Sequence, residues 1–170
     1  KGTSLAQLLV KKIDTTTKNI FQNVQKNFKG SLGETLVWRN TSGAHCLFLG
    51  LGSSSKPDAE TLRKAGGHLY SVLKSNHFST ATINTSGLQA ATAIAGFAEG
   101  LVMSSYSYTS FKAENKKAYK LETVDIAVDK TSAALTKALK DSQSIGEATN
   151  FSRWLGDSPG NFMTPTQLSK

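Results

Sequence analysis

Residues 146–170 read GEATNFSRWLGDSPGNFMTPTQLSK, and this stretch carries the signals that decide the fold. From Ile145 to Leu155, apolar residues recur at helical spacing, which predicts a helix. Thr164 followed by Pro165 is typical of an N-cap and a first-turn proline, so a further helix is predicted to begin there. A helix that opens at the last residues indicates a longer natural sequence, and we expect a second domain to follow.

The sequence before this stretch alternates between strand and helix patterns. Strands are predicted over residues 5–13, 35–39, 45–51, 78–84 and 124–128, and helices over residues 15–28, 57–73, 88–103, 131–140 and 145–155. The turn residues 40–43 predict a hairpin between the second and third strands. Strands that alternate with helices of this length predict an α/β fold with layered elements.

Length and composition place the chain among globular proteins. The 170 residues suffice for one domain with a real core, and 38% of them are hydrophobic while 19% are charged. No apolar run approaches the ~20 residues that cross a bilayer, and no secretory signal pattern is present. A single cysteine, Cys46, excludes an internal disulfide and indicates a reducing, cytoplasmic location. Because the sequence starts at Lys1 rather than Met, a removed targeting segment stays possible.

The net charge of +8 is concentrated near the N-terminus, where residues 1–40 hold seven of the 20 basic residues and two of the 12 acidic ones. A basic region of this kind can meet nucleic acid or an acidic partner. The lysines, however, lie among Gln, Asn and Thr, without an Arg cluster and with few aromatic residues. We therefore favour a solvated basic face over a nucleic-acid site.

Candidate catalytic and binding residues have structural interpretations that we prefer. The loop Gly50–Lys56 lies between a strand and a helix, where amides can hold a phosphate, but it matches neither a Walker A motif nor G-x-G-x-x-G. The three histidines are too scattered for a metal pair, and Cys46 has no C-x-x-C partner. Glu99 lies in an otherwise apolar helix, so we expect it to be paired with a neighbouring segment. The three histidines are His45, His68 and His77.

Three blocks of residues occur in a particular order along the chain. They are Phe28-Lys29-Gly30 with Gly33-Glu34; Ala98-Glu99-Gly100-Leu101 with Tyr106 and Phe111-Lys112; and Asn150, Phe151, Arg153, Leu155, Pro159, Asn161, Thr164 and Pro165. In this order they resemble the N-terminal part of the leucyl aminopeptidase family M17. Ser152, Trp154 and Gly160 depart from the family pattern.

The resemblance implies a three-layer α/β/α sandwich with a mixed sheet, similar to macrodomains. It implies an N-terminal domain over residues 1–142 and a helical connection over residues 143–170, which leads to an absent catalytic domain. That absent domain would hold two divalent metal ions, Zn or Mn, and would remove N-terminal residues from peptides within a homo-hexamer. Arg153, Trp154 and residues 157–165 would lie near the junction.

No catalytic, cofactor-binding or metal-binding residue of the family can be assigned to this sequence, so the chain by itself is expected to be inactive. Its expected partner is its own catalytic domain. Two alternatives stay open from the residues alone. The first is a macrodomain-like module that binds ADP-ribose or another phosphate through the loop Gly50–Lys56, and the second is an accessory domain that binds nucleic acid through the basic N-terminal region.

Overall fold

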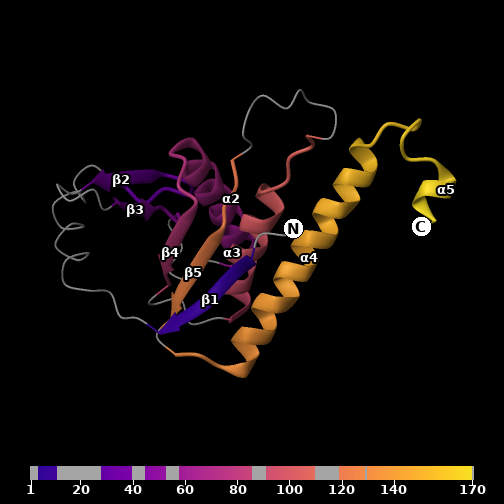
Figure 1. Ribbon diagram of the computed structural model, residues 1–170. Coiled ribbons are helices and arrows are strands. Elements are labelled where there is room, and N and C mark those ends of the chain that lie inside the picture. Colours follow the sequence, from indigo (N-terminus) through magenta and orange to yellow (C-terminus); the bar gives the residue numbers. More distant parts are fainter. Residues whose placement is uncertain are drawn as a thin grey trace.

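The computed structural model describes residues 4–10, 28–39, 45–52, 58–85, 91–109, 119–128 and 130–169 (Figure 1). The elements are β1 Ser4–Val10, β2 Thr35–Arg39, β3 His45–Leu49, α2 Ala59–Ser75, β4 Thr80–Asn84, α3 Ala91–Ser104, β5 Thr123–Val128, α4 Ala133–Asp157 and α5 Pro165–Leu168. Three predicted segments lie outside the described residues. They are the helix over residues 15–28 except for its last residue, the hairpin turn at residues 40–43, and residues 53–56 of the loop.

The described strands form two sheets. Strands β1, β5 and β4 pair in parallel with β5 in the centre, and β2 pairs antiparallel with β3 from Thr35↔Leu49 to Arg39↔His45. The parallel pair β4–β5 requires a crossover, which α3 supplies. The α/β fold and the strand hairpin are therefore confirmed. The single mixed sheet is not found among the described strands, because the parallel and antiparallel pairings belong to separate sheets.

The core lies on the face of β5 that carries Val124, Ile126 and Val128, which alternate along the strand as one sheet face requires. Val124 joins a cluster with α2 and α3, while Ile126 and Val128 join a second cluster with α3 and α4. All three helices therefore cover the same face, and Figure 1 shows α2 and α3 behind the sheet. The three-layer and macrodomain-like details stay predictions.

Helix α3 is apolar around most of its circumference because it packs on three sides. It contacts α2, α4 and the sheet. Glycines allow α2 and α3 to approach closely. A Cβ atom at Gly100 would lie 1.9 Å from the main-chain oxygen of Arg63, and one at Gly66 would lie 2.2 Å from that of Phe97. Larger residues at these positions would push the helices apart.

Helix α2 starts at Ala59, two residues later than the sequence suggested. Asp58 is the N-cap, and its carboxylate accepts a hydrogen bond from the Thr61 amide at 2.7 Å. Hydrogen bonding with the Thr61 side chain, and then with the Thr61 amide, lowers the pKa of Asp58. Pro57 was predicted at a first helical position, but it precedes the N-cap. The helix ends in a Schellman motif, in which the amides of His77 and Phe78 donate to Lys74 and Leu73.

Helix α4 is one continuous helix of 25 residues, so the prediction of two separate helices over residues 131–140 and 145–155 is wrong. The polar residues between them continue the helix through side-chain pairs four residues apart, Lys137 with Asp141 and Gln143 with Glu147. Ser142 is buried within this segment. The polar residues between the two predicted helices therefore lie inside α4 and do not end it.

The C-terminal half of α4 extends away from the sheet and leads to α5 (Figure 1). Thr164 is the N-cap of α5 and Pro165 is its first residue, which confirms the predicted helix start. No residue of α5 is buried. Among the described residues, no helix is long and apolar enough to span a membrane.

Candidate functional site

His45 and Cys46 are neighbours on β3, while His68 lies on α2 and His77 follows the end of α2. The three histidine side chains are exposed, and the His45 ring lies 4.7 Å from the Phe78 ring. Cys46 is half-buried on the hairpin. Within the described ranges, no three His, Cys, Asp or Glu side chains are grouped so that they could hold a metal ion. All three histidines lie at the surface of the described structure.

The described start of the loop Gly50–Lys56 is a packed turn. The Gly50 amide donates to Glu34 O at 2.7 Å, and the Gly52 amide donates to Gly30 O at 2.9 Å. A Cβ atom at Gly50 would lie 2.0 Å from Ser31 O, and Gly52 adopts φ +85°. These amides already have acceptors within the protein. The described part of the loop therefore gives no support to a phosphate site.

Glu34 explains why the first motif block has its spacing. Its carboxylate accepts hydrogen bonds from the amides of Lys29 at 3.1 Å and Ser31 at 2.9 Å, and so closes the turn that packs on Gly50. These backbone hydrogen bonds, first from Lys29 and then from Ser31, lower the pKa of Glu34. The block therefore builds a structural turn.

Glu99 is paired across the helix interface, as its place in an apolar helix predicted. Arg63 Nε on α2 donates to Glu99 Oε1 at 3.0 Å, and Arg63 also pairs with Glu60 on its own helix. The hydrogen bond to Glu99 raises the pKa of Arg63. This ion pair connects α2 with α3 and is structural.

The second and third motif blocks meet at the end of α3. Asn150 Nδ2 on α4 donates to Val102 O at 2.7 Å, and Arg153 Nη1 donates to Met103 O at 2.8 Å. A cation beside the last carbonyl groups of a helix is stabilised by the helix dipole. Sequence reasoning placed Arg153 near a domain junction but missed this contact. The i,i+3 spacing of Asn150 and Arg153, which puts both on one helix face, was the available signal.

The segment after α3 makes a further link to α4. Tyr106 Oη donates to Asp157 Oδ2 at 2.6 Å. Partial desolvation, followed by this hydrogen bond, raises the pKa of Tyr106 to about 12, so the hydroxyl stays protonated near neutral pH. The second and third motif blocks, which are about 50 residues apart in sequence, thus contact each other through these hydrogen bonds.

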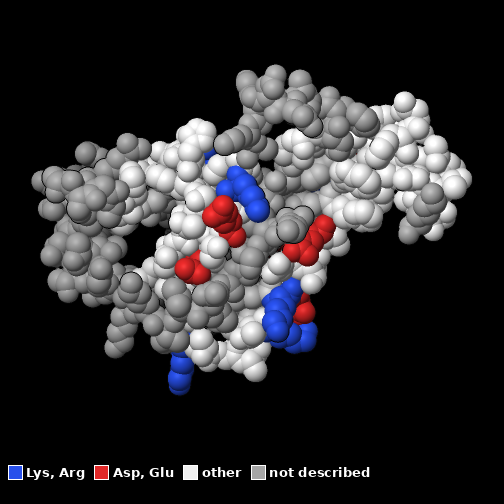
Figure 2. Space-filling view, in the orientation of Figure 1, with Lys and Arg blue, Asp and Glu red and all other residues white. Residues whose placement is uncertain are grey.

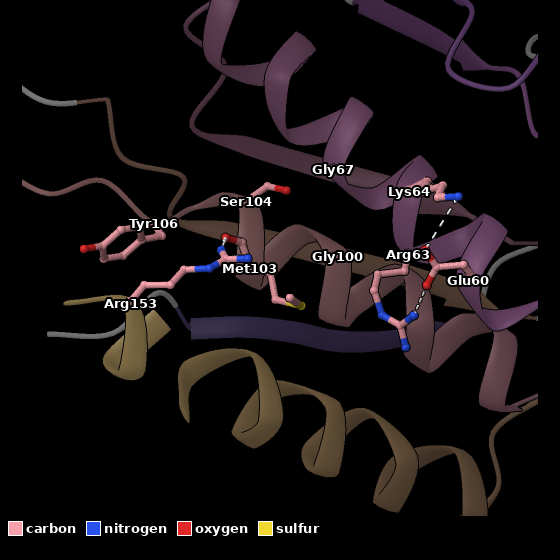
Figure 3. A pocket seen from close by; sticks show the side chains of 9 residues that line it. All are labelled: Glu60, Arg63, Lys64, Gly67, Gly100, Met103, Ser104, Tyr106 and Arg153. Atoms are coloured by element: carbon pink, nitrogen blue, oxygen red, sulfur yellow. Dashed lines mark hydrogen bonds and ion pairs between the residues drawn. The ribbon is translucent and has the colours of Figure 1, made fainter. Parts of the chain in front are cut away.

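Beside these contacts lies a hollow of about 460 Å³ (Figure 3). Its lining comes from α2, α3, the segment after α3, and α4, and consists of Glu60, Arg63, Lys64, Gly67, Gly100, Met103, Ser104, Tyr106 and Arg153. Figure 2 shows basic and acidic side chains next to each other on the visible face, with neither sign gathered into one patch among the described residues. The lining holds no nucleophile–base pair that would indicate a reaction at this position.

Comparison with known proteins identifies the family. Residues 1–115 match the model of the N-terminal domain of the cytosol aminopeptidase family. The chain belongs to the cytosol aminopeptidase family. A probable cytosol aminopeptidase of Bdellovibrio bacteriovorus is 29% identical over 153 residues, which are 85% of this chain and 31% of that protein. One of Sinorhizobium fredii is 32% identical over 129 residues, which are 72% of this chain and 26% of that protein.

Solved structures show the same fold. A mutant of tomato leucine aminopeptidase superposes with a TM-score of 0.74 at 19% identity, covering 99% of this chain and 38% of that one. The bottromycin maturation enzyme BotP in complex with Mn gives a TM-score of 0.68 at 20% identity, covering 97% of this chain and 33% of that one. The chain thus spans about a third of the length of these relatives and corresponds to the N-terminal domain of cytosol aminopeptidases.

Proposed function

We propose that this chain is the non-catalytic N-terminal domain of a metalloaminopeptidase that removes N-terminal residues from peptides. The observation that carries the proposal is the family match over residues 1–115 together with the relatives' greater length. The peptide substrate and two divalent ions, Zn or Mn, would be bound by a catalytic domain beyond Lys170. A solved neighbour that contains Mn supports the choice of metal.

The C-terminal region of the chain provides the surface on which that catalytic domain would pack. Phe151 is 58% exposed and its ring stacks on Trp154 at 5.9 Å, while Phe162 and Leu168 are 44% and 61% exposed. Soluble proteins rarely leave several large apolar side chains exposed in one region without a partner. The stripe that the sequence predicted on residues 145–155 is therefore largely uncovered. The buried side of α4, which carries Leu135, Leu139, Ser142 and Gly146, packs along α3 instead.

The finer assignments follow from the family. We place the N-terminal domain at residues 1–142 and the connection at residues 143–170, although one helix runs through this boundary. A homo-hexamer and a cytoplasmic location complete the proposal for the whole enzyme. The relatives' name, cytosol aminopeptidase, supports the location.

Activity measurements on two proteins test the proposal. The 170-residue chain and a version extended by the sequence that follows Lys170 would each be incubated with leucine p-nitroanilide and Mn²⁺ or Zn²⁺. We expect metal-dependent hydrolysis from the extended protein and none from the 170-residue chain, because a metal-activated water requires the ligands of the second domain. Turnover that stays with the 170-residue chain through repeated purification, or an extended protein that is inert with both metals, would contradict the proposal.

A further inference from the structure

Helix α4 changes its mode of attachment along its length. Its buried residues begin at Leu135 and end at Gly146, and no residue from Glu147 to Asp157 is buried. At Gly146 the two helices are in close contact, since a Cβ atom there would lie 2.8 Å from Val102 Cβ. A helix of about three turns that buries no side chain is marginal in water. The segment Glu147–Asp157 therefore needs other contacts to stay beside α3.

Side-chain hydrogen bonds supply such contacts. Within the described residues, three of them join the segment Glu147–Asp157 to the end of α3 and the residues that follow. They are those of Asn150 with Val102 O at 2.7 Å, Arg153 with Met103 O at 2.8 Å, and Asp157 with the Tyr106 hydroxyl at 2.6 Å. Residues 150, 153 and 157 are three and four positions apart, so they share one helix face. We call Asn150, Arg153 and Asp157 the polar latch.

Two members of the polar latch support each other. The Asn150 side chain donates to Val102 O through Nδ2, while its Oδ1 lies 3.4 Å from Arg153 Nη1. Val102 O also accepts hydrogen bonds from the amide and the hydroxyl of Ser105, at 3.1 and 2.7 Å. The end of α3 therefore keeps partners for this carbonyl when Asn150 is absent. Loss of the Asn150 side chain should weaken the hold on α4 and leave α3 intact.

The segment that the polar latch holds also carries the stacked pair of Phe151 and Trp154. Each of these rings follows a latch residue directly in sequence, and their centroids are 5.9 Å apart. The Phe151 side chain is 58% exposed, so this pair adds little packing against the core. Any movement of the segment relative to α3 would move both rings with it.

We propose that the polar latch is a conformational device: the segment Glu147–Asp157 opens from α3 as a unit, while the part of α4 before Gly146 stays packed. Regions with few buried apolar contacts open at a lower free energy than the core around them. The latch thus sets the position of Phe151 and Trp154. That this position matters for docking of a catalytic domain rests on the proposed function, whereas the opening itself does not.

Native-state amide hydrogen exchange of the ¹⁵N-labelled 170-residue chain tests the device without any measurement of peptidase activity. The amides of residues 147–157 are compared with those of residues 137–146 in the same helix. Tyr106→Phe removes the hydrogen bond to Asp157 without changing the sequence of α4, and Asn150→Ala removes two contacts while raising helix propensity. Ser152→Ala is the matched control, because the Ser152 hydroxyl bonds only to Ala148 O within α4.

In the unmodified chain we expect residues 147–157 to exchange roughly tenfold faster than residues 137–146. Tyr106→Phe and Asn150→Ala should each speed exchange of residues 147–157 by about fivefold, as for the loss of one hydrogen bond, and should leave residues 137–146 unchanged. Ser152→Ala should not speed exchange in either part. Equal protection of the two parts, faster exchange of both parts in the latch variants, or no effect of either latch variant on residues 147–157 would overturn the proposal.

Discussion

Arg63 on α2 and Glu99 on α3 form a nearly bidentate ion pair, with Nε 3.0 Å from Oε1 and Nη2 3.4 Å from Oε2. The two ends differ in environment, since the side chain of Glu99 is 15% exposed and that of Arg63 is 33% exposed. Removing Arg63 leaves a largely buried carboxylate without its partner. Removing Glu99 leaves an arginine that still pairs with Glu60.

We therefore expect Arg63→Met to lower the free energy of unfolding by about 2 kcal/mol, and Glu99→Met to cost less. The exposed pair Lys137–Asp141 is the control, and its disruption should cost about 0.5 kcal/mol at most. Urea denaturation followed by circular dichroism gives these values. A larger loss for Glu99→Met than for Arg63→Met would contradict the asymmetry.

Gly100 and Gly156 should respond in opposite directions to the same substitution. At Gly100 a Cβ atom would lie 1.9 Å from Arg63 O, whereas at Gly156 in α4 nothing lies within 4 Å. Gly100→Ala should destabilise the protein by about 2–3 kcal/mol because α2 and α3 must separate. Gly156→Ala should stabilise it by up to about 1 kcal/mol through helix propensity. Thermal unfolding of both variants measures the difference, and equal shifts of the melting temperature would show that the close helix approach is wrong.

His77 adopts φ 57° in the motif that ends α2, a conformation that costs a side-chain-bearing residue energy. His77→Gly should therefore raise the free energy of unfolding by about 1 kcal/mol. His68→Gly, in the interior of the same helix, should lower it by about 1 kcal/mol. Denaturation of the two variants side by side tests this, and destabilisation by His77→Gly would mean that the imidazole makes a contribution larger than the strain.

Glu34 should make stability depend on acidic pH. Its pKa is lowered in the folded state by hydrogen bonds from the Lys29 and Ser31 amides, so its contribution is present above the ordinary glutamate pKa. That contribution is lost as the pH falls through the lowered, folded-state value. Glu34→Gln should be less stable than the unmodified chain at neutral pH, and the difference should shrink in acid. Denaturation across this pH range measures it, and a difference that is independent of pH would refute the assignment.

Phe151 and Trp154 lie on a surface that the proposed catalytic domain would cover. In the isolated chain we expect weak self-association through this surface. Trp154→Asp should reduce it, with a stability change no larger than about 1 kcal/mol. Phe151→Asp is a second variant, because Phe151 is the more exposed ring. Sedimentation velocity over a concentration series decides the matter: a strict monomer at high concentration, or unfolding caused by Trp154→Asp, would show that Trp154 belongs to the core.

Some features of this protein could be read from the sequence because they depend on residues close together in the chain. Thr164 caps α5 through an amide three residues away, and the pattern of β5 requires only alternate apolar residues. The need of Glu99 for a partner followed from a carboxylate in an apolar helix. The family, and with it the fold, followed from the order of three short blocks.

Other features were decided by the tertiary structure, because they join residues that are distant in sequence. The sequence could not tell that Arg63, 36 residues away, would pair with Glu99, or that Asn150 and Arg153 would bind the carbonyl groups that end α3. Packing along α3 and side-chain pairs four residues apart made α4 one helix where local polarity suggested a break. The hollow beside Arg153 exists only because three helices bring their side chains to one place, and no short stretch of sequence contains that information.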